Sequence, residues 1–331
     1  MEQLVNEFSW SKSRDGTFLE CSRQYWFQYY GSWGGWEVGA DPRTREIYVL
    51  KQLKTRHMWL GERVHRAIER TLRNLAASPK PLAVDPDEII RITIEEMRLD
   101  FKSSRAGIYR ARPKSCGLFE HEYGIAVPNE EWRNVAATAE RCLRNFYGSE
   151  IFRLIQASER KDWLELEDFS SFELEGVRVH VVLDFALRRD GDIVIYDWKT
   201  GGSDERDNRI QMACYAFYAH QKWGAAPEQV CPIEVNLNRG ETTDYHLTTA
   251  DLDRTRAYLA GSIADMRRVL RDTERNLAIE EDFPKIKGKY YTYVLDLLME
   301  RGVNRVSIGV VDDISNSTGF DRQQVIAQDL R

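Results

Sequence analysis

The sequence predicts an α/β protein in which a mixed central sheet is flanked by helices, with a helical N-terminal part and a helical insertion. Up to about residue 160, the apolar residues recur with the period of helices. From 163 to 200, short segments of alternating apolar and polar residues are separated by turns that contain glycine, which is typical of strands. The last of these segments, Asp192–Thr200, is apolar on both faces, as expected for a central strand that is covered on both sides.

The first half of the chain is expected to be mostly helical. Ser11 or Ser13 can cap a helix that runs to about Tyr30. The segment 60–77 carries a buried stripe at helical spacing, formed by Val64, Ile68, Leu72 and Leu75. Further helices are predicted at 43–58, 86–103 and 129–156, and a strand at 119–127.

Turns separate the predicted strands of the second half of the chain. Glu175–Gly176 separates predicted strands at 163–175 and 177–187, and the turn Arg188–Gly191 leads into Asp192–Thr200. The remaining predicted elements are a helix at 208–223, strands at 231–238 and 243–248, a helix that opens at Thr249–Asp251 and runs to about 276, a helix at 289–301 and a strand at 304–311. The chain is therefore divided into a helical N-terminal part with an insertion (1–160), a core (161–275) and a C-terminal extension that is packed or partly disordered (276–331).

Composition favours a soluble globular protein, with 42% hydrophobic and 30% charged residues. No apolar run is long enough to span a membrane, and the first residues lack the features of a signal peptide. The 5 cysteines are scattered and form no CxxC pair, which argues against a disulfide framework or a zinc ribbon. We therefore expect a cytoplasmic protein with no membrane partner.

Charge is distributed unevenly along the chain. Residues 1–116 hold 20 Lys and Arg against 15 Asp and Glu, whereas residues 117–331 hold 27 against 38. A basic front and an acidic rear suit a protein that binds a polyanion at one end and a metal at the other. Ordinary solvated charge is the alternative, and the sequence does not decide between the two.

Acidic and basic residues converge near the end of the central strand. Asp197 and Lys199 lie two residues apart and so share one face. A tight turn joins this strand to the preceding one, which places Asp184 close to Asp197. Gln211 and Tyr215 lie four apart on the next helix and share its face. Two carboxylates with His65 from the helix at 60–77 make a ligand set for Mg²⁺ or Mn²⁺.

Each of these residues also has a structural interpretation. Asp197 and Lys199 can pair with each other, His65 can be a satisfied half-buried histidine, and Tyr215 can belong to the core. His180 shares the strand face of Asp184 and competes as a metal ligand. Three further acidic residues are interpreted as solvated strand charges: Glu165, Glu167 and Glu173. The aromatic residues from Tyr25 to Trp36 can pack a helix onto the body or stack bases, and we favour packing.

The pattern D-x12-D-x-K-T-G, followed by Q-x3-Y and preceded by a G-x-x-x-H helix, resembles the PD-(D/E)XK nuclease superfamily. It is most similar to the branch of RecB-type recombination nucleases and CRISPR-associated adaptation nucleases. The segment LECSRQYWFQYY resembles the Cys-Pro-Arg opening of that branch, with Ser22 in place of proline. Another departure is Val182, where many members carry glycine.

The resemblance implies a restriction-endonuclease-like fold and a role for each residue. The metal ligands would be His65, Asp184, Asp197 and the carbonyl of Trp198. Lys199 would act on the attacking water and the developing charge, and Gln211 and Tyr215 would orient the lysine or a phosphate. Many members hold an iron–sulfur cluster through four cysteines, but only Cys21 matches, so no cluster is expected.

The function expected from this resemblance is metal-dependent hydrolysis of DNA, by an exonuclease or end-processing nuclease in repair, recombination or defence. Single-stranded or frayed ends are the favoured substrate. No GxxxxGK[ST] motif occurs, so any helicase or motor would be a separate partner. The alternatives are a nuclease-fold subunit that binds DNA without cutting it, and an RNA nuclease. The residues expected to contact nucleic acid are Lys51, Lys54, Arg56, Arg63 and Arg66.

Overall fold

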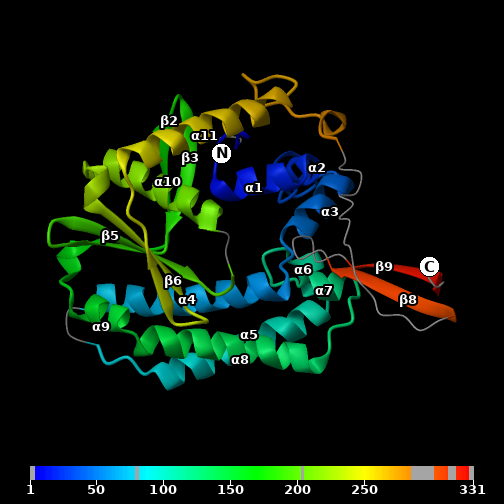
Figure 1. Cartoon of the computed structure of the whole chain (residues 1–331), viewed down its shortest axis with the longest axis horizontal. Coiled ribbons are helices and arrows are strands. Elements are labelled where there is room, and N and C mark those ends of the chain that lie inside the picture. The colour runs from blue at the N-terminus through cyan, green and yellow to red at the C-terminus, as the bar shows by residue number, and fades with distance from the viewer. Residues whose placement is uncertain (1–3, 79–81, 203–204, 285–301, 312–317, 328–331) are drawn as a thin grey trace. The chain divides into compact units, whose positions relative to one another are not determined.

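The computed structural model describes residues 4–78, 82–202, 205–284, 302–311 and 318–327 (Figure 1). It separates into two compact units, residues 1–285 and 286–331. The parts expected at 1–160 and 161–275 both lie within the first unit. In the second unit, strands β8 (Gly302–Val311) and β9 (Thr318–Ala327) pair antiparallel, which places β8 where a strand was expected. The helix expected at 289–301 lies outside the described residues.

Helices make up most of the N-terminal half of the first unit, and others follow in its C-terminal half. They are α1 (Lys12–Glu20), α2 (Ser22–Trp26) with a π-helical continuation (Phe27–Gly31), α3 (Pro42–Lys51), α4 (Arg56–Ala77), α5 (Pro86–Arg105), α6 (Ile108–Ala111), α7 (Phe119–Glu122), α8 (Asn129–Gly148), α9 (Glu150–Ala157), α10 (Glu205–Trp223) and α11 (Thr249–Arg268). Short 3-10 turns lie at Arg160–Asp162, Pro227–Gln229 and Glu280–Asp282.

The central sheet is mixed and has five strands in the order β1-β4-β5-β6-β7. The strands are β1 (Trp163–Glu165), β4 (Phe185–Arg189), β5 (Asp192–Lys199), β6 (Val230–Asn236) and β7 (Glu241–Asp244). β5 and β6 run parallel and are connected through α10, whereas the other neighbours are antiparallel. The mixed sheet with flanking helices confirms the predicted α/β, restriction-endonuclease-like fold.

A separate hairpin extends from this sheet. β2 (Asp168–Leu174) and β3 (Val177–Leu183) form a two-stranded sheet of their own, with one bridge from Val179 to Trp10, although β1 and β4 are their immediate continuations. The strands predicted at 163–175 and 177–187 are therefore each broken once. The first breaks at Glu167, which has a left-handed φ of 51°, and the second breaks at Asp184. These two breaks place both side chains at the corner between sheet and hairpin.

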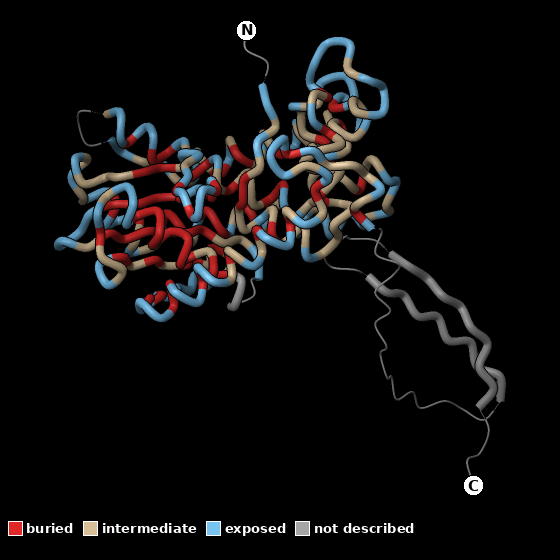
Figure 2. The backbone as a smooth tube through the Cα atoms, turned by 90° about the horizontal axis from the view of Figure 1, so that it is seen from above, coloured by how far each residue is buried: buried red, intermediate tan, exposed pale blue. Residues whose placement is uncertain are grey.

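Both faces of the sheet are covered. Ile193 and Ile195 of β5 pack in one core with α10 and α11, whereas Val194, Tyr196 and Trp198 pack in a second core with α4 and α8. Figure 1 shows α4, α5 and α8 on one side of the strands and α10 and α11 on the other, and Figure 2 shows the buried residues gathered in the interior with exposed residues around them. The side-chain alternation predicted for the central strand is confirmed.

Local signals explain where several elements begin and turn. Glu175 and Gly176 have φ of 50° and 74°, and Asp190 and Gly191 have φ of 53° and 95°, so both predicted turns use two left-handed residues. Thr248 and Asp251 form a reciprocal capping box that starts α11 where the sequence predicted a helix.

Other predicted boundaries were wrong, for identifiable reasons. The helix expected to reach Tyr30 breaks at Cys21, whose backbone is extended and whose sulfur caps α2. Ser149 caps a new helix and so divides 129–156. The segment 43–58 divides before α4, where Lys54 pairs by two backbone hydrogen bonds with 117–119. This single bridge replaces the strand expected at 119–127, which instead contains α7. The helix expected to reach 276 ends at Arg268.

Among the described residues, no helix combines the length and the apolar character that crossing a membrane would require.

Candidate active site

The corner between the sheet and the hairpin holds Asp184. β4 and β5 pair in a register that matches Phe185 with Tyr196, so Asp184 faces the end of β5. Its Oδ2 accepts a 2.5 Å hydrogen bond from the backbone N–H of Trp198, and the residue is buried. The bond fixes the carboxylate beside Asp197, as the sequence predicted for the two aspartates.

His65 approaches Asp184 from α4, which covers the sheet face that lies opposite to α10. Its Nε2 lies 3.0 Å from the carbonyl oxygen of Trp198, and its Nδ1 lies 3.3 Å from Oδ1 of Asp184. The helix can come this close because Gly61 lacks a side chain. A Cβ at that position would lie 3.1 Å from Oγ1 of Thr200, tighter than most real contacts.

Glu167 completes a three-residue cluster. Its left-handed backbone, with the N–H donating to the carbonyl of Leu183, turns the carboxylate toward His65. Oε1 of Glu167 lies 3.4 Å from Nδ1 of His65 and is buried without a hydrogen-bond partner. Donor atoms of His65, Glu167 and Asp184 all lie within 4.8 Å of one another. Together with the Trp198 carbonyl, this oxygen-rich set fits a divalent cation of the Mg²⁺ or Mn²⁺ type.

The sequence interpretation of Glu165 and Glu167 as solvated strand charges was wrong. Glu165 is buried and accepts hydrogen bonds from Tyr218 and Lys222, and Glu167 belongs to the cluster. Only Glu173 is exposed as expected. The available signal was weak: adjacent charges at Glu167 and Asp168 interrupt the strand alternation, which indicates a bulge without saying where the side chain points. His180, the competing ligand, lies outside the cluster.

A second group of side chains surrounds Asp197 on the α10 face of β5. Oδ1 of Asp197 accepts hydrogen bonds from Tyr215 at 2.8 Å and from Gln211 at 3.1 Å, while Oδ2 lies 2.6 Å from Nζ of Lys199. Nζ of Lys199 also donates to Gln211 at 3.2 Å. The structure thus brings together all four residues that the sequence grouped here. Asp197 itself points to Lys199 rather than into the His65 cluster, and its assignment as a metal ligand stays a prediction.

The electrostatics of this corner depart from those of isolated side chains. Burial lowers the pKa of His65, but the carboxylates of Asp184 and Glu167 outweigh it and hold that pKa well above its ordinary value. Burial raises the pKa of Glu167 and of Asp197. Burial lowers the pKa of Lys199, yet the nearby Asp197 and other carboxylates raise it on balance. Clustered, mutually perturbed titratable groups of this kind are typical of functional sites.

The sequence profile of the PD-(D/E)XK nuclease superfamily matches residues 9–289 of the chain. The chain belongs to this superfamily. Its match includes both α4 and β5, and therefore every residue of the corner described above. The correspondence of Asp184, Asp197 and Lys199 to the motif of this superfamily stays a prediction. A comparison with the sequences of curated proteins gives no match.

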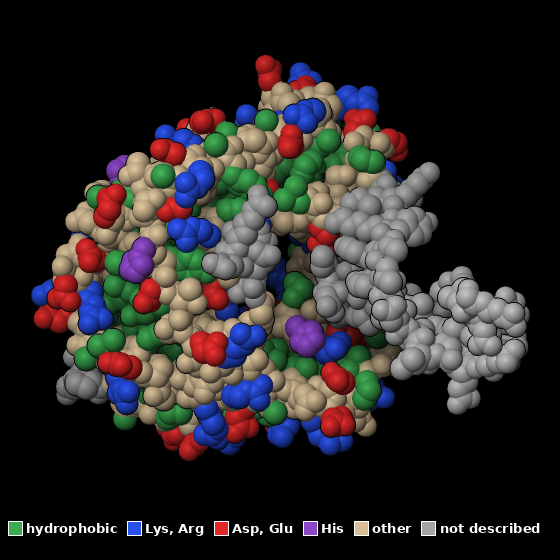
Figure 3. Space-filling model, in the orientation of Figure 1, with side chains coloured by type: hydrophobic (Ala, Val, Ile, Leu, Met, Phe, Trp, Pro, Cys, Tyr) green, Lys and Arg blue, Asp and Glu red, His purple; other side chains and the backbone are tan. Residues whose placement is uncertain are grey.

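This nuclease-superfamily member presents few unpaired cations where nucleic-acid contacts were predicted. Four of the five residues have carboxylate partners: Lys54 and Arg66 with Glu62, Arg56 with Glu120 and Glu131, and Arg63 with Asp100 and Glu96. Lys51 is exposed and lies 5.4 Å from the ring centre of Tyr29. Basic and acidic side chains are interspersed on the face shown in Figure 3. A role of these five residues in binding nucleic acid stays a prediction.

The N-terminal aromatic residues mainly pack. Tyr25 is fully buried in the core that contains α10 and α11, and Tyr29 and Tyr30 pack against that core. Trp33 and Trp36 are partly exposed and contact each other edge to face. The favoured packing interpretation therefore holds for the helical aromatics.

Proposed function

We propose that this protein is a metal-dependent nuclease that hydrolyses DNA phosphodiester bonds and processes DNA ends as an exonuclease in repair, recombination or defence. The observation that carries the proposal is the convergence of His65, Glu167 and Asp184 within 4.8 Å, beside the Asp197–Lys199 pair. Membership of the nuclease superfamily supports it. The order of the motifs further supports placement in the RecB-like branch. We propose that the protein acts in the cytoplasm on single-stranded or frayed DNA ends, together with a separate motor protein.

The donor set of the corner suits a hard divalent cation. The residues that would hold it are His65, Glu167, Asp184 and the carbonyl of Trp198, with Oδ2 of Asp197 as a further donor. Oε1 of Glu167 is buried and has no hydrogen-bond partner, which is costly unless another group engages it, whereas Oδ2 of Asp197 is already paired with Lys199. A cation bound there would supply a Lewis acid that acidifies water and offsets phosphate charge.

The side chains of the chain itself would position the reacting groups. Lys199, anchored by Asp197 and Gln211, would present its ammonium to the charge that develops on the phosphate in the transition state. Tyr215 and Gln211 hold Asp197 in place by hydrogen bonds, so they act as positioning residues. The backbone N–H of Trp198 holds Asp184 in the same way.

The test is a cleavage assay with purified protein on labelled single- and double-stranded DNA and RNA, with Mg²⁺, Mn²⁺ or EDTA. We expect DNA to be cut with either metal and to remain intact in EDTA, with products released from single-stranded ends. Cleavage of RNA alone would make the protein a ribonuclease. The absence of cleavage on all four substrates with both metals would reject hydrolysis and leave a nuclease-fold binding subunit.

A further inference from the structure

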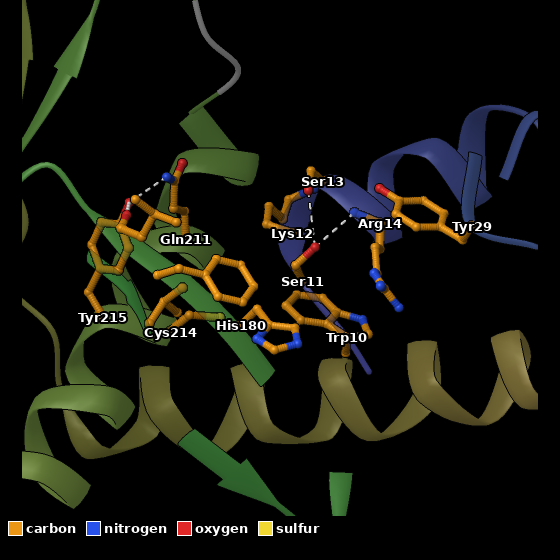
Figure 4. Close-up of a pocket in the computed structure, with 13 residues that line it drawn as sticks. Trp10, Ser11, Lys12, Ser13, Arg14, Tyr29, His180, Gln211, Cys214 and Tyr215 are labelled. Atoms are coloured by element: carbon orange, nitrogen blue, oxygen red, sulfur yellow. Dashed lines mark hydrogen bonds between the residues drawn. The ribbon is translucent and has the colours of Figure 1, made fainter. Parts of the chain in front are cut away.

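A cavity of about 560 Å³ opens beside the proposed active site. It lies between α1, the hairpin strand β3 and α10, and Figure 4 shows Gln211 and Tyr215 at one end with Arg14 and Tyr29 at the other. Gln211 and Tyr215 both line the cavity and donate hydrogen bonds to Asp197, so one end of the cavity adjoins the proposed catalytic residues.

The N-terminal segment builds one wall by pairing with the hairpin. The N–H of Trp10 donates to the carbonyl of Arg178 at 2.9 Å, and the N–H of His180 donates to the carbonyl of Trp10 at 2.8 Å. Asp15 of α1 is buried and accepts hydrogen bonds from Tyr258 and Ser262 of α11. These contacts hold Trp10 against the hairpin and α1 against α11, so the fold itself builds this wall of the cavity.

The hairpin wall carries an exposed aromatic surface. Phe169 is 72% exposed, and its ring stacks on that of His180 with centres 4.6 Å apart. Phe169 lies directly opposite Val182 in the hairpin register. Val182 and Asp184 are two residues apart, about 7 Å along a strand, so the aromatic surface lies roughly one nucleotide from the proposed metal cluster. A ligand that covers this exposed ring would remove apolar surface from water, which favours binding.

The charge of the cavity is one-sided. Lys12 and Arg14 line it, and no carboxylate is among the described residues that do, although Lys12 pairs with the buried Asp15 at 3.6 Å. Arg14 lies 4.4 Å from the ring centre of Tyr29, and the exposed Lys51 lies 5.4 Å from the same centre. This contrasts with the other basic residues near α4, whose charges are neutralised by carboxylates. Aromatic faces next to Arg14 and Lys51, which have no carboxylate partner among the described residues, form the combination that binds single-stranded nucleotides.

We propose that this cavity is a subsite for one unpaired nucleotide next to the bond that is cut: its base stacks on Phe169 and His180, and its phosphate contacts Arg14 and Lys51. The proposal deepens the proposed function, on which it rests, by naming the residues that would hold the unpaired nucleotide beside the cut. Duplex DNA cannot place a base there without unstacking it.

The test is a thermodynamic cycle between the base and Phe169. An eight-nucleotide oligothymidylate, and versions with one abasic position moved along it, are titrated against wild type and Phe169→Ala. Ca²⁺ replaces Mg²⁺, and a gel confirms that the strand stays intact. Leu99→Ala on α5, with a side chain 57% exposed, is the matched control. Thermal unfolding of each variant verifies folding.

We expect one abasic position to weaken wild-type binding about tenfold, within the range known for base stacking on aromatic side chains. Phe169→Ala should weaken binding of the intact strand by a similar factor, and the abasic position should then cost nothing more. Leu99→Ala should match wild type. Unchanged binding by Phe169→Ala, or a full abasic penalty in that variant, would overturn the subsite.

Cleavage with Mn²⁺, measured in parallel, separates the two proposals. A wild type that cuts DNA but shows no coupling between base and Phe169 overturns the subsite and leaves the nuclease. A wild type that cuts nothing but shows the coupling overturns hydrolysis and leaves a binding site for single strands.

Discussion

The backbone of Trp198 connects Asp184 and His65: its N–H donates to the Asp184 carboxylate at 2.5 Å, and its carbonyl oxygen lies 3.0 Å from Nε2 of His65. The side chain of Trp198 meanwhile points into the core on the α4 and α8 side. Trp198, between Asp197 and Lys199, thus holds Asp184 and His65 in place through its backbone. Because every residue except proline supplies both backbone groups, the middle position of D-x-K can hold different side chains without changing this geometry.

Replacing Glu167 should weaken metal binding. Glu167→Gln keeps the size of the side chain but removes the charge of one donor, so we expect the affinity for Mn²⁺ in isothermal titration calorimetry to fall by about tenfold or more. Glu173→Gln, on an exposed position of the same hairpin, is the matched control and should bind as wild type does. Equal affinities for the two variants would exclude Glu167 as a ligand.

Lys199→Ala should separate binding from catalysis. The ammonium is expected to act mainly on the transition state, so the single-turnover cleavage rate should fall by about two orders of magnitude or more while the Kd for DNA changes little. Lys161→Ala, which removes an exposed lysine, should leave the rate unchanged. If the Kd of Lys199→Ala rises as much as its rate falls, the lysine is a binding residue instead.

Gly61→Ala should displace His65. The added methyl group would meet Oγ1 of Thr200 at 3.1 Å, and overpacking of this kind costs about 1–3 kcal/mol. We expect lower Mn²⁺ affinity and a lower melting temperature. Adding Thr200→Ala removes the opposing oxygen and should restore both. A double variant as impaired as Gly61→Ala would show that the contact is not the cause.

Lys51→Glu should weaken DNA binding and flatten its salt dependence by about one unit in the log–log slope. Among the five predicted nucleic-acid contacts, it is the one whose described surroundings include no carboxylate partner. The matched control is Arg98→Glu, an exposed α5 residue paired with Glu95. If both variants keep the wild-type slope, the DNA path does not pass Lys51. The affinity for metal should be unchanged in both variants.

Asp251→Ala should destabilise the protein in a pH-dependent way. Hydrogen bonds from Thr248 and the charge of Arg209 hold the pKa of Asp251 below its usual range. A lowered folded-state pKa adds stability above the unfolded pKa of about 4, and this stability is lost as the pH falls further. We expect a loss of about 1 kcal/mol at pH 7, shrinking below pH 4, in urea unfolding. Asp253→Ala, an exposed neighbour on the same helix, should cost much less, and an equal cost for both variants would contradict the capping role.

Several features follow from short stretches of sequence alone. Alternation in Asp192–Lys199 determines which side chains of β5 face α10, because successive strand side chains point to opposite faces. Asp190–Gly191 fixes the turn that brings Asp184 beside Asp197, since both residues tolerate left-handed backbone. The same local logic places the start of α11 at Thr248–Asp251. The motif around Asp197 and Lys199 therefore indicated the family and the corner of the fold that holds the candidate site.

Only the tertiary structure decided what meets that corner. Glu167 joins His65 because the strand breaks at a left-handed residue and its partner strand breaks at Asp184, and neither break follows from alternation alone. The cations near α4 differ in their availability because carboxylates from α4, α5 and α7 neutralise some of them, whereas Lys51 lies beside Tyr29. Residues 10–14 line a cavity with 180–182 because distant backbone segments pair. Periodicity is local, but contacts between charges and surfaces depend on which elements pack together, and packing is set by the whole chain.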